Sequence, residues 1–259
     1  MRFNLIPTLA AVFMAGVLAA LAGSAQAEVT FNAGARLSND NNVSGSPDKA
    51  NQRSDNYLTL SASAVYFTPL NAAQTSYFIG QVGALSSSYN HYNNLDNSML
   101  VASAGLYRQL SPTWSGQITG RAFTRDTRQS DRDSDGFGGT LEIKKQLSQT
   151  VWLKGVADYE DNKANLNMFS YTGETYGLNL GYLPLKDTFI NLGYSHATRD
   201  FKNATPFVSK AQTLFAEVTQ RVSKNWYLSG GYAYVKNDSN FAGTAYTNQI
   251  WSVGLNFSY

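Results

Sequence analysis

The sequence has no cysteine and only six prolines in 259 residues. Without cysteine, the chain has neither a disulfide framework nor a lipid-modified cysteine at an export cleavage point. Its mean hydropathy is −0.29, and beyond the N-terminal segment it lacks a second apolar run of about 18 residues. If the chain lies in a membrane, it must therefore do so as a closed barrel, because only helices and closed barrels satisfy all their backbone groups in lipid.

An excess of charge of one sign is also lacking, since 20 lysines and arginines oppose 18 acidic residues. Loss of Arg2 with an N-terminal leader would leave 19 basic residues and a net charge near +1. This balance gives no electrostatic basis for a nucleic-acid partner. The chain instead contains 16 tyrosines, 14 phenylalanines and 21 glycines, which fits a tyrosine- and glycine-rich β protein, and no pattern in it indicates a cofactor.

The first 27 residues have the three parts of a secretory signal peptide. Arg2 is the charged residue, an apolar stretch runs from Leu5 to Leu21, and the small-residue motif Ala25-Gln26-Ala27 follows. An uncleaved anchor is the alternative, but the stretch is slightly shorter than the roughly 20 residues of a membrane span. We therefore expect a cleaved signal peptide at 1–27 and one mature domain at 28–259.

Short turns recur along the mature chain at a spacing near 38 residues. Longer polar segments separate them, so each repeat is expected to form one up-and-down hairpin with a short turn at one end and a longer loop at the other. This asymmetry is typical of outer-membrane barrels. The five turns lie at 67–71, 110–114, 147–152, 184–187 and 222–226.

Between the turns, apolar and polar residues alternate, as in Leu58, Leu60 and Ala62. A soluble β-sandwich would alternate too, but it would leave the charged residues of its other face in solvent, whereas a barrel points them into a polar lumen. The predicted fold is all-β, a single antiparallel up-and-down transmembrane β-barrel of about twelve strands. The strands are expected at 28–38, 54–68, 75–89, 98–109, 114–127, 136–147, 151–162, 172–183, 188–200, 209–222, 226–237 and 246–259.

An aromatic residue follows each short turn: Tyr77, Trp114, Trp152, Phe189 and Trp226. Aromatic side chains are enriched at the two membrane–water interfaces. We therefore expect these five to lie at the interface on the side of the short turns.

The face opposite to the apolar one carries many charged residues. In the predicted register Glu160 and Arg199 lie there together with the residues that we expect to line the lumen. Rings of basic side chains favour anions in a pore, whereas paired charges plug a narrow barrel, and both alternatives remain open. The predicted lumen-lining residues are Arg36, Arg121, Arg125, Glu142, Lys144, Lys154, Asp158, Glu217 and Arg221.

The last strand ends the chain on an aromatic residue, with Trp251, Val253, Leu255, Phe257 and Tyr259 alternating outward. Gly254, Phe257 and Tyr259 resemble the C-terminal signal that the outer-membrane assembly machinery reads, although that signal usually ends in Phe. The segment 236–241 and the strand after it also resemble the barrel ends of surface lipoprotein assembly modifiers and of porin-like proteins. These resemblances imply an outer-membrane barrel in contact with outer-membrane lipid and the assembly machinery.

Two other groups of residues suggest chemistry. His91 and His196 fall near the loop end, where some outer-membrane enzymes of similar architecture hold a histidine, a serine and an orienting group for lipid hydrolysis. Asp131, Asp133 and Asp135 have the spacing of a calcium loop, although the strand pattern that follows argues against a helix–loop–helix site. An interface histidine and a solvated acidic loop are the simpler interpretations.

The sequence thus favours a narrow porin-like channel for small polar, and in particular anionic, solutes and not an enzyme. Arg121 and Arg125, on one strand, are the residues expected to set the anion preference. The alternatives are a structural or assembly barrel without a conducting pore and an outer-leaflet lipid hydrolase.

Processing is expected after Ala27, because Ala25 and Ala27 have the small side chains that a signal peptidase accepts. N-terminal sequencing of the protein extracted from membranes should read Glu28 first. A mature protein that still begins at Met1 would remove the main reason for assigning an exported location.

Overall fold

The computed structural model describes residues 27–202 and 207–259. Cleavage after Ala27 therefore stays a prediction, because the signal peptide up to residue 26 lies outside the described residues. Twelve β-strands make up most of the described chain. They are β1 (Glu28–Asp40), β2 (Asp55–Pro69), β3 (Ser76–Tyr89), β4 (Asn97–Gln109), β5 (Trp114–Thr127), β6 (Ser134–Gln146), β7 (Val151–Ala164), β8 (Tyr171–Leu185), β9 (Thr188–Phe201), β10 (Phe207–Arg221), β11 (Trp226–Ser239) and β12 (Tyr246–Ser258).

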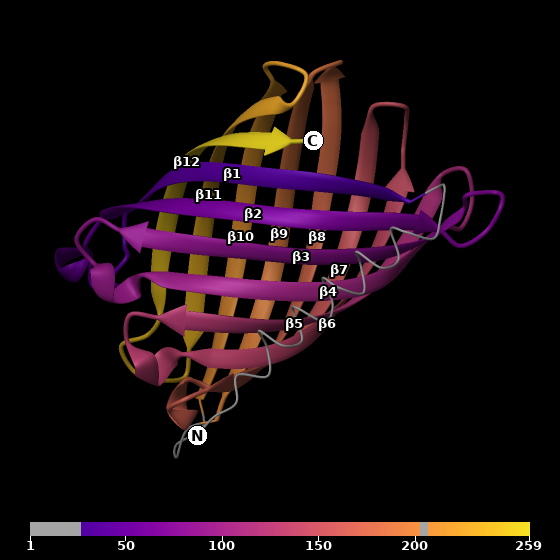
Figure 1. Ribbon diagram of the computed structural model, residues 1–259. Coiled ribbons are helices and arrows are strands. Elements are labelled where there is room, and N and C mark those ends of the chain that lie inside the picture. The colour runs from indigo at the N-terminus through magenta and orange to yellow at the C-terminus, as the bar shows by residue number, and fades with distance from the viewer. Residues whose placement is uncertain (1–26, 203–206) are drawn as a thin grey trace.

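The strands form one closed antiparallel barrel (Figure 1). Each strand pairs with its neighbours in sequence, and β1 closes the sheet by pairing with β12 from Asn32–Ser258 to Asp40–Ile250. Closure leaves no strand edge without a hydrogen-bonded partner. The predicted fold is confirmed, and every predicted strand bound lies within two residues of the observed one.

The two ends of the barrel differ as the sequence predicts, with short turns at one end and longer loops at the other. Four of the longer loops contain a single turn of 3-10 helix: η1 (Lys49–Asn51), η2 (Asn93–Leu95), η3 (Ser130–Arg132) and η4 (Asn167–Phe169). After η2, η3 and η4 a polar side chain accepts a hydrogen bond from the backbone N–H near the end of the preceding strand. These bonds join Tyr89 to Asp96 (2.7 Å), Thr127 to Asp133 (2.7 Å) and Ala164 to Ser170 (2.9 Å).

The same loops are also tied to one another through their backbones. The carbonyl oxygens of Asp96, Asp133 and Ser170 accept bonds from the N–H groups of the next loop, at Arg128 (3.0 Å), Asn165 (2.8 Å) and Lys202 (2.8 Å). Because these three acceptors recur every 37 residues, the hairpin repeat seen in the sequence is also a repeat of loop structure.

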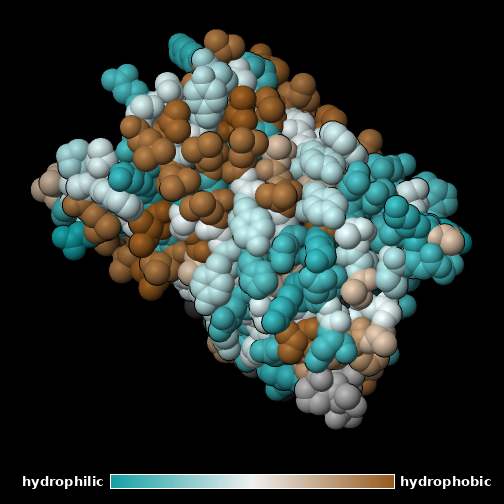
Figure 2. Space-filling model, turned by 180° about the vertical axis from the view of Figure 1, so that it is seen from behind, coloured by the Kyte–Doolittle hydropathy of each residue, from teal (hydrophilic) through white to brown (hydrophobic). Residues whose placement is uncertain are grey.

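The outward face of the sheet is apolar. Leu214, Trp251 and Ile118 are 56%, 59% and 60% exposed, and they alternate with polar residues on the inner face. Figure 2 shows hydrophobic residues gathered over one part of the rear face and hydrophilic residues toward its right and lower sides. In residues 27–202 and 207–259, no helix has the length and apolar character needed to cross a membrane.

The aromatic residues after the short turns do not all lie outward, and here the sequence-based expectation is wrong for three of five. Trp114 and Trp226 are the first residues of their strands and lie on the outer face. Tyr77, Trp152 and Phe189 are second in theirs, and because side chains alternate between faces, the shift of one position turns them inward.

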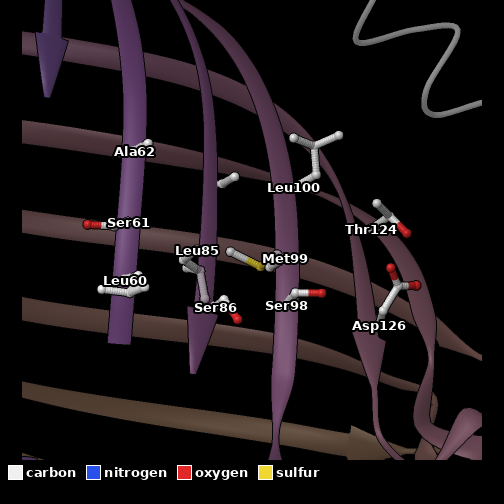
Figure 3. A pocket seen from close by; sticks show the side chains of 11 residues that line it. Leu60, Ser61, Ala62, Leu85, Ser86, Ser98, Met99, Leu100, Thr124 and Asp126 are labelled. Carbon is white, nitrogen blue, oxygen red and sulfur yellow. The ribbon is translucent and has the colours of Figure 1, made fainter. Parts of the chain in front are cut away.

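The outer wall also contains a hollow of about 420 Å³ on β2 to β5 (Figure 3). The outward residues Ala62, Ala84 and Ser86 are small there and leave room between Leu60 and Leu100. Eight of the eleven lining residues belong to the outward face, so the hollow lies mainly on the outside of the wall.

The C-terminal strand closes the barrel through its last residues. The backbone N–H and carbonyl of Tyr259 pair with those of Phe31 at 2.9 and 2.8 Å, and the Phe257 ring packs on Trp226 at 5.1 Å between centroids. Phe257 and Tyr259 therefore join the end of the chain to both neighbouring strands.

We predict that deletion of Tyr259, or Phe257→Asp, abolishes assembly into the membrane, because both changes damage the predicted assembly signal. Trp226→Asp is the matched control, since it places the same charge beside Phe257 without touching the last strand. A charge on the lipid face costs about 2–4 kcal/mol at the midplane and less toward the rim, so the control should lose only part of its level. Equal membrane levels of all three variants, measured by immunoblot of outer-membrane fractions, would contradict the prediction.

Candidate functional site

The structure places every predicted lumen-lining residue on the inner face of the barrel. Each alternates along its strand with residues of the apolar outer face, as Arg121 does between Gly120 and Ala122. Strands β1, β5, β6, β7 and β10 supply them all. The inner residues are Arg36, Arg121, Arg125, Glu142, Lys144, Lys154, Asp158, Glu217 and Arg221, joined by Glu160 and Arg199.

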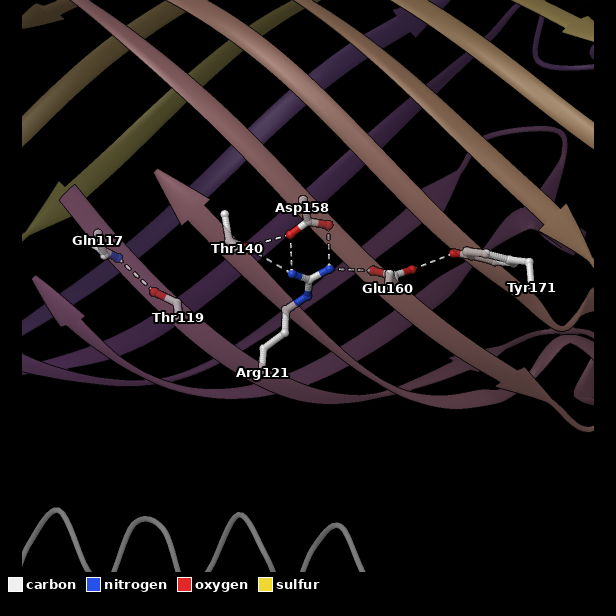
Figure 4. Close-up of polar contacts among 7 residues, drawn as sticks. All are labelled: Gln117, Thr119, Arg121, Thr140, Asp158, Glu160 and Tyr171. Carbon is white, nitrogen blue, oxygen red and sulfur yellow. Dashed lines mark hydrogen bonds and ion pairs between the residues drawn. The ribbon is translucent and has the colours of Figure 1, made fainter. Parts of the chain in front are cut away.

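Arg121 lies at the centre of a network across four neighbouring strands (Figure 4). Its guanidinium donates two hydrogen bonds to Asp158 (2.5 and 3.0 Å) and one to Glu160 (2.9 Å). The hydroxyls of Thr140 and Tyr171 donate to the same carboxylates, each at 2.6 Å. Two carboxylates therefore compensate the single charge of Arg121.

Two further ion pairs join inner residues. Arg36 reaches Glu217 at 2.5 Å across the β1–β12–β11–β10 side of the wall, and Lys154 reaches Glu142 at 3.1 Å between adjacent strands. All four side chains are between 28% and 43% exposed, so the pairs face an accessible, polar lumen. Arg221 lies nearer the turn end, 3.9 Å from Asp187.

Three inner cations contact aromatic rings instead of carboxylates. Arg125 lies over the Phe123 ring at 5.6 Å, Lys144 over Trp152 at 4.4 Å, and Arg199 over Tyr171 at 5.0 Å. None of them forms a salt bridge with an acidic residue of the described chain. Arg121 and Arg125, which the sequence analysis expected to act together, therefore differ: carboxylates compensate the charge of Arg121 but not that of Arg125.

Glycines on the inner face give the large side chains room against the wall. A Cβ at Gly181 would overlap the ring of Trp152, which lies directly over it. A Cβ at Gly138 would come within 2.8 Å of the Arg121 guanidinium. These gaps let a ring and a guanidinium lie flat instead of extending toward the barrel axis.

A cavity of about 410 Å³ opens from the lumen near the short turns. Trp152 and Phe189 stack there, with ring centroids 5.4 Å apart and planes 5° from parallel. The remaining inward lining comes from cations, one acid, amides, a tyrosine and a serine. These residues are Tyr107, Ser115, Gln117, Glu142, Lys144, Lys154, Asn179 and Asn191. Tyr107, Trp152, Phe189 and the amides were not predicted as site residues. Alternation in the sequence already places Asn179 and Asn191 on the inner face, but only the strand pairing brings them together with the aromatic rings.

At the loop end the inner face is more closely packed and still polar. Buried polar residues there come from several strands and do not belong to the predicted site. Polar strand ends were hard to separate from loops in the sequence, so this belt was missed. It comprises Ser38, Asp40, Asp55, Ser134, Asn162, Asn237 and Asn248.

The two histidines are not placed for nucleophilic catalysis. His91 Nδ1 lies 3.0 Å from Asp55, and His196 Nε2 lies 3.4 Å from the Thr198 hydroxyl. In the described part of the chain no serine hydroxyl hydrogen-bonds either imidazole.

The calcium candidate is likewise not assembled. Asp133 caps the end of β5 through Thr127, and Asp135 lies on the outward face of β6. Among the described residues, no three His, Cys, Asp or Glu side chains are close enough together to hold a metal ion. Asp131 does not join the other two aspartates in a site.

Comparison with known proteins identifies the fold. No protein-family model matches the chain, and no curated protein matches it in sequence. Among solved structures, an outer-membrane channel from Pseudomonas putida F1 is similar with a TM-score of 0.64 at 10% identity, over 92% of this chain and 97% of that one. The KdgM porin in complex with disordered oligogalacturonate gives a TM-score of 0.53 at 11% identity, over 88% and 99%. The chain therefore has the fold of outer-membrane channels and porins.

Because Asp158 and Glu160 are only 22% and 21% exposed, removing their cation should destabilise the barrel. We predict that Arg121→Gln lowers the free energy of unfolding by about 2–3 kcal/mol, the usual cost of losing a charged partner. The variant with Arg121→Gln, Asp158→Asn and Glu160→Gln has no charge left to compensate and should recover most of the loss. Urea unfolding of the refolded barrel measures both, and an Arg121→Gln variant as stable as the parent would contradict the prediction.

Proposed function

We propose that this chain is exported, inserts in the outer membrane and forms a narrow channel for the passive passage of small polar solutes, with a preference for anions. The apolar outer wall and the predicted signal peptide support the location, and the polar, partly exposed inner face supports a water-filled lumen. Gly254, Phe257 and Tyr259 are proposed as the signal for assembly.

The observation that carries the anion preference is the imbalance between paired and free charges. Of the inner acids between the loop end and the short turns, Glu142 and Glu217 each pair with one cation, and Asp158 and Glu160 share Arg121. Two further inner acids, Asp40 and Asp55, are buried in the loop-end belt, where they accept hydrogen bonds. Arg125, Lys144 and Arg199 have aromatic partners, which leave their charge uncompensated. A positive charge within a narrow lumen of low-dielectric walls concentrates anions more strongly than one on an open surface.

The fold comparison supports a channel but not its solute. The KdgM porin, with the same architecture, is described in complex with oligogalacturonate, an acidic oligosaccharide. A barrel of this shape is therefore compatible with the passage of an anionic solute.

A non-conducting structural barrel is the second candidate, and the polar belt at the loop end favours it. The belt residues Asn162 and Ser38 are only 2% and 3% exposed, so neighbouring side chains cover the inner face there, unlike the partly exposed ion pairs Arg36–Glu217 and Lys154–Glu142. Single-channel recording decides between the two candidates, since only the channel gives a conductance.

We predict that Lys144→Gln lowers the anion-to-cation permeability ratio, because it removes an uncompensated charge from the lumen. The change should be about two- to fivefold, since a unit charge at contact distance contributes about 1 kcal/mol in water. Reversal potentials of the purified protein in a planar bilayer under a salt gradient measure the ratio.

Two controls accompany this variant. Lys145→Gln removes the same charge from the adjacent position, where the side chain lies outside the barrel over Trp114 at 5.0 Å. The double change Glu142→Gln and Lys154→Gln removes an ion pair and leaves the net charge constant. Both should keep the parental reversal potential, and a Lys144→Gln variant that also keeps it would overturn the proposed anion preference.

A further inference from the structure

We infer that the cavity beside the short turns is a binding subsite for an acidic sugar, recognised through its carboxylate, its ring face and its hydroxyls. The inference deepens the proposed channel function, because the cavity opens from the lumen. Its volume of about 410 Å³ lies within the roughly 300–1,000 Å³ typical of small-molecule sites.

The carboxylate would be bound by the lysines of the cavity. Lys154 is paired with Glu142 at 3.1 Å, whereas Lys144 has no carboxylate partner in the described chain. The cavity therefore has one uncompensated positive charge. The Lys144 ammonium lies 4.4 Å from the centroid of the Trp152 ring, a contact that leaves its hydrogen-bond donors available to a solute carboxylate.

The ring face would be bound by the aromatic side chains. Trp152 is held over Gly181 and stacked on Phe189, and Tyr107 lies in the same lining. Aromatic faces carry partial negative charge, and they attract the C–H groups of a sugar ring while contributing apolar contact area. A simple inorganic anion would gain nothing from these rings.

The hydroxyls would be bound by the amides. Asn179 and Asn191 both line the cavity, and neither makes a side-chain hydrogen bond to any described residue. An amide offers both donors and an acceptor, which suits a hydroxyl that donates and accepts at once. An aromatic carboxylate without hydroxyls would leave these amides unpartnered, so the lining favours a sugar acid over an aromatic acid.

Trp152 provides a direct reporter of binding. Of the four tryptophans it is the one on the inner face, since Trp114, Trp226 and Trp251 lie outward. The protein with these three replaced by phenylalanine would be refolded in detergent and titrated with glucuronate while its fluorescence is recorded. We expect a saturable change in Trp152 emission.

Lys144→Gln in this background should weaken glucuronate binding about tenfold, which corresponds to about 1.4 kcal/mol. Lys145→Gln, which changes the same charge on the outer face, should bind as the parent does. Equal weakening by both variants, or no effect of Lys144→Gln, would overturn the assignment of the carboxylate to Lys144.

Two further ligands test the charge and the ring separately. Glucose has the ring and hydroxyls without the charge, and gluconate has the charge and hydroxyls without the ring. Both should bind at least several-fold more weakly than glucuronate. Gluconate binding as tightly as glucuronate would overturn the role of the rings, and glucose binding as tightly would overturn the role of the lysines.

Conductance of the same protein keeps this inference separate from the proposed function. Saturable binding of glucuronate without any conductance would support the subsite and reject the channel. Conductance without a change in Trp152 emission at any glucuronate concentration would support the channel and reject the subsite.

Discussion

The structure depends on one constraint, which is that every backbone hydrogen bond of the wall must be made within the sheet. The pairing of β1 with β12 meets it by closing the ladder. Closure also divides the side chains strictly, because successive residues of a strand lie on opposite faces. Leu214 and its outward counterparts therefore form an apolar wall, and the charges left on the other face must find partners across the lumen or in water.

The cations of the inner face have two kinds of partner, carboxylates and aromatic rings. Arg121 forms ion pairs with Asp158 and Glu160 and so stabilises the wall. Lys144 and the other uncompensated cations lie over aromatic rings instead. A ring positions a cation without cancelling its charge. The glycines complete the arrangement, since Gly181 makes room for Trp152 at the wall and keeps the lumen free of its bulk. The charge and the width of the lumen are thus set by different residues.

The strands and the face of each charge could be predicted from the sequence, because alternation and turn spacing are local patterns. Which charged side chains pair with one another could not be predicted. Arg121 and Arg125 look equivalent in sequence, and only the stagger between β5 and β7 brings carboxylates to the first of them. The same limit explains the error at Trp152. The face on which an aromatic side chain lies depends on whether it is the first or the second residue of its strand, and the turn spacing does not locate the start of a strand to one residue. The cavity beside the short turns was missed for the same reason, since residues of six strands, β4 to β9, line it.

The repeated loop bonds at the base of the rim have a mechanical consequence. Asp96, Asp133 and Ser170 each fix their own loop through a side chain and the following loop through a carbonyl oxygen. A displacement of one loop is therefore transmitted to the next loop, so the joined loops move together and not independently. A movement that opens this end of the barrel must then involve several neighbouring loops together.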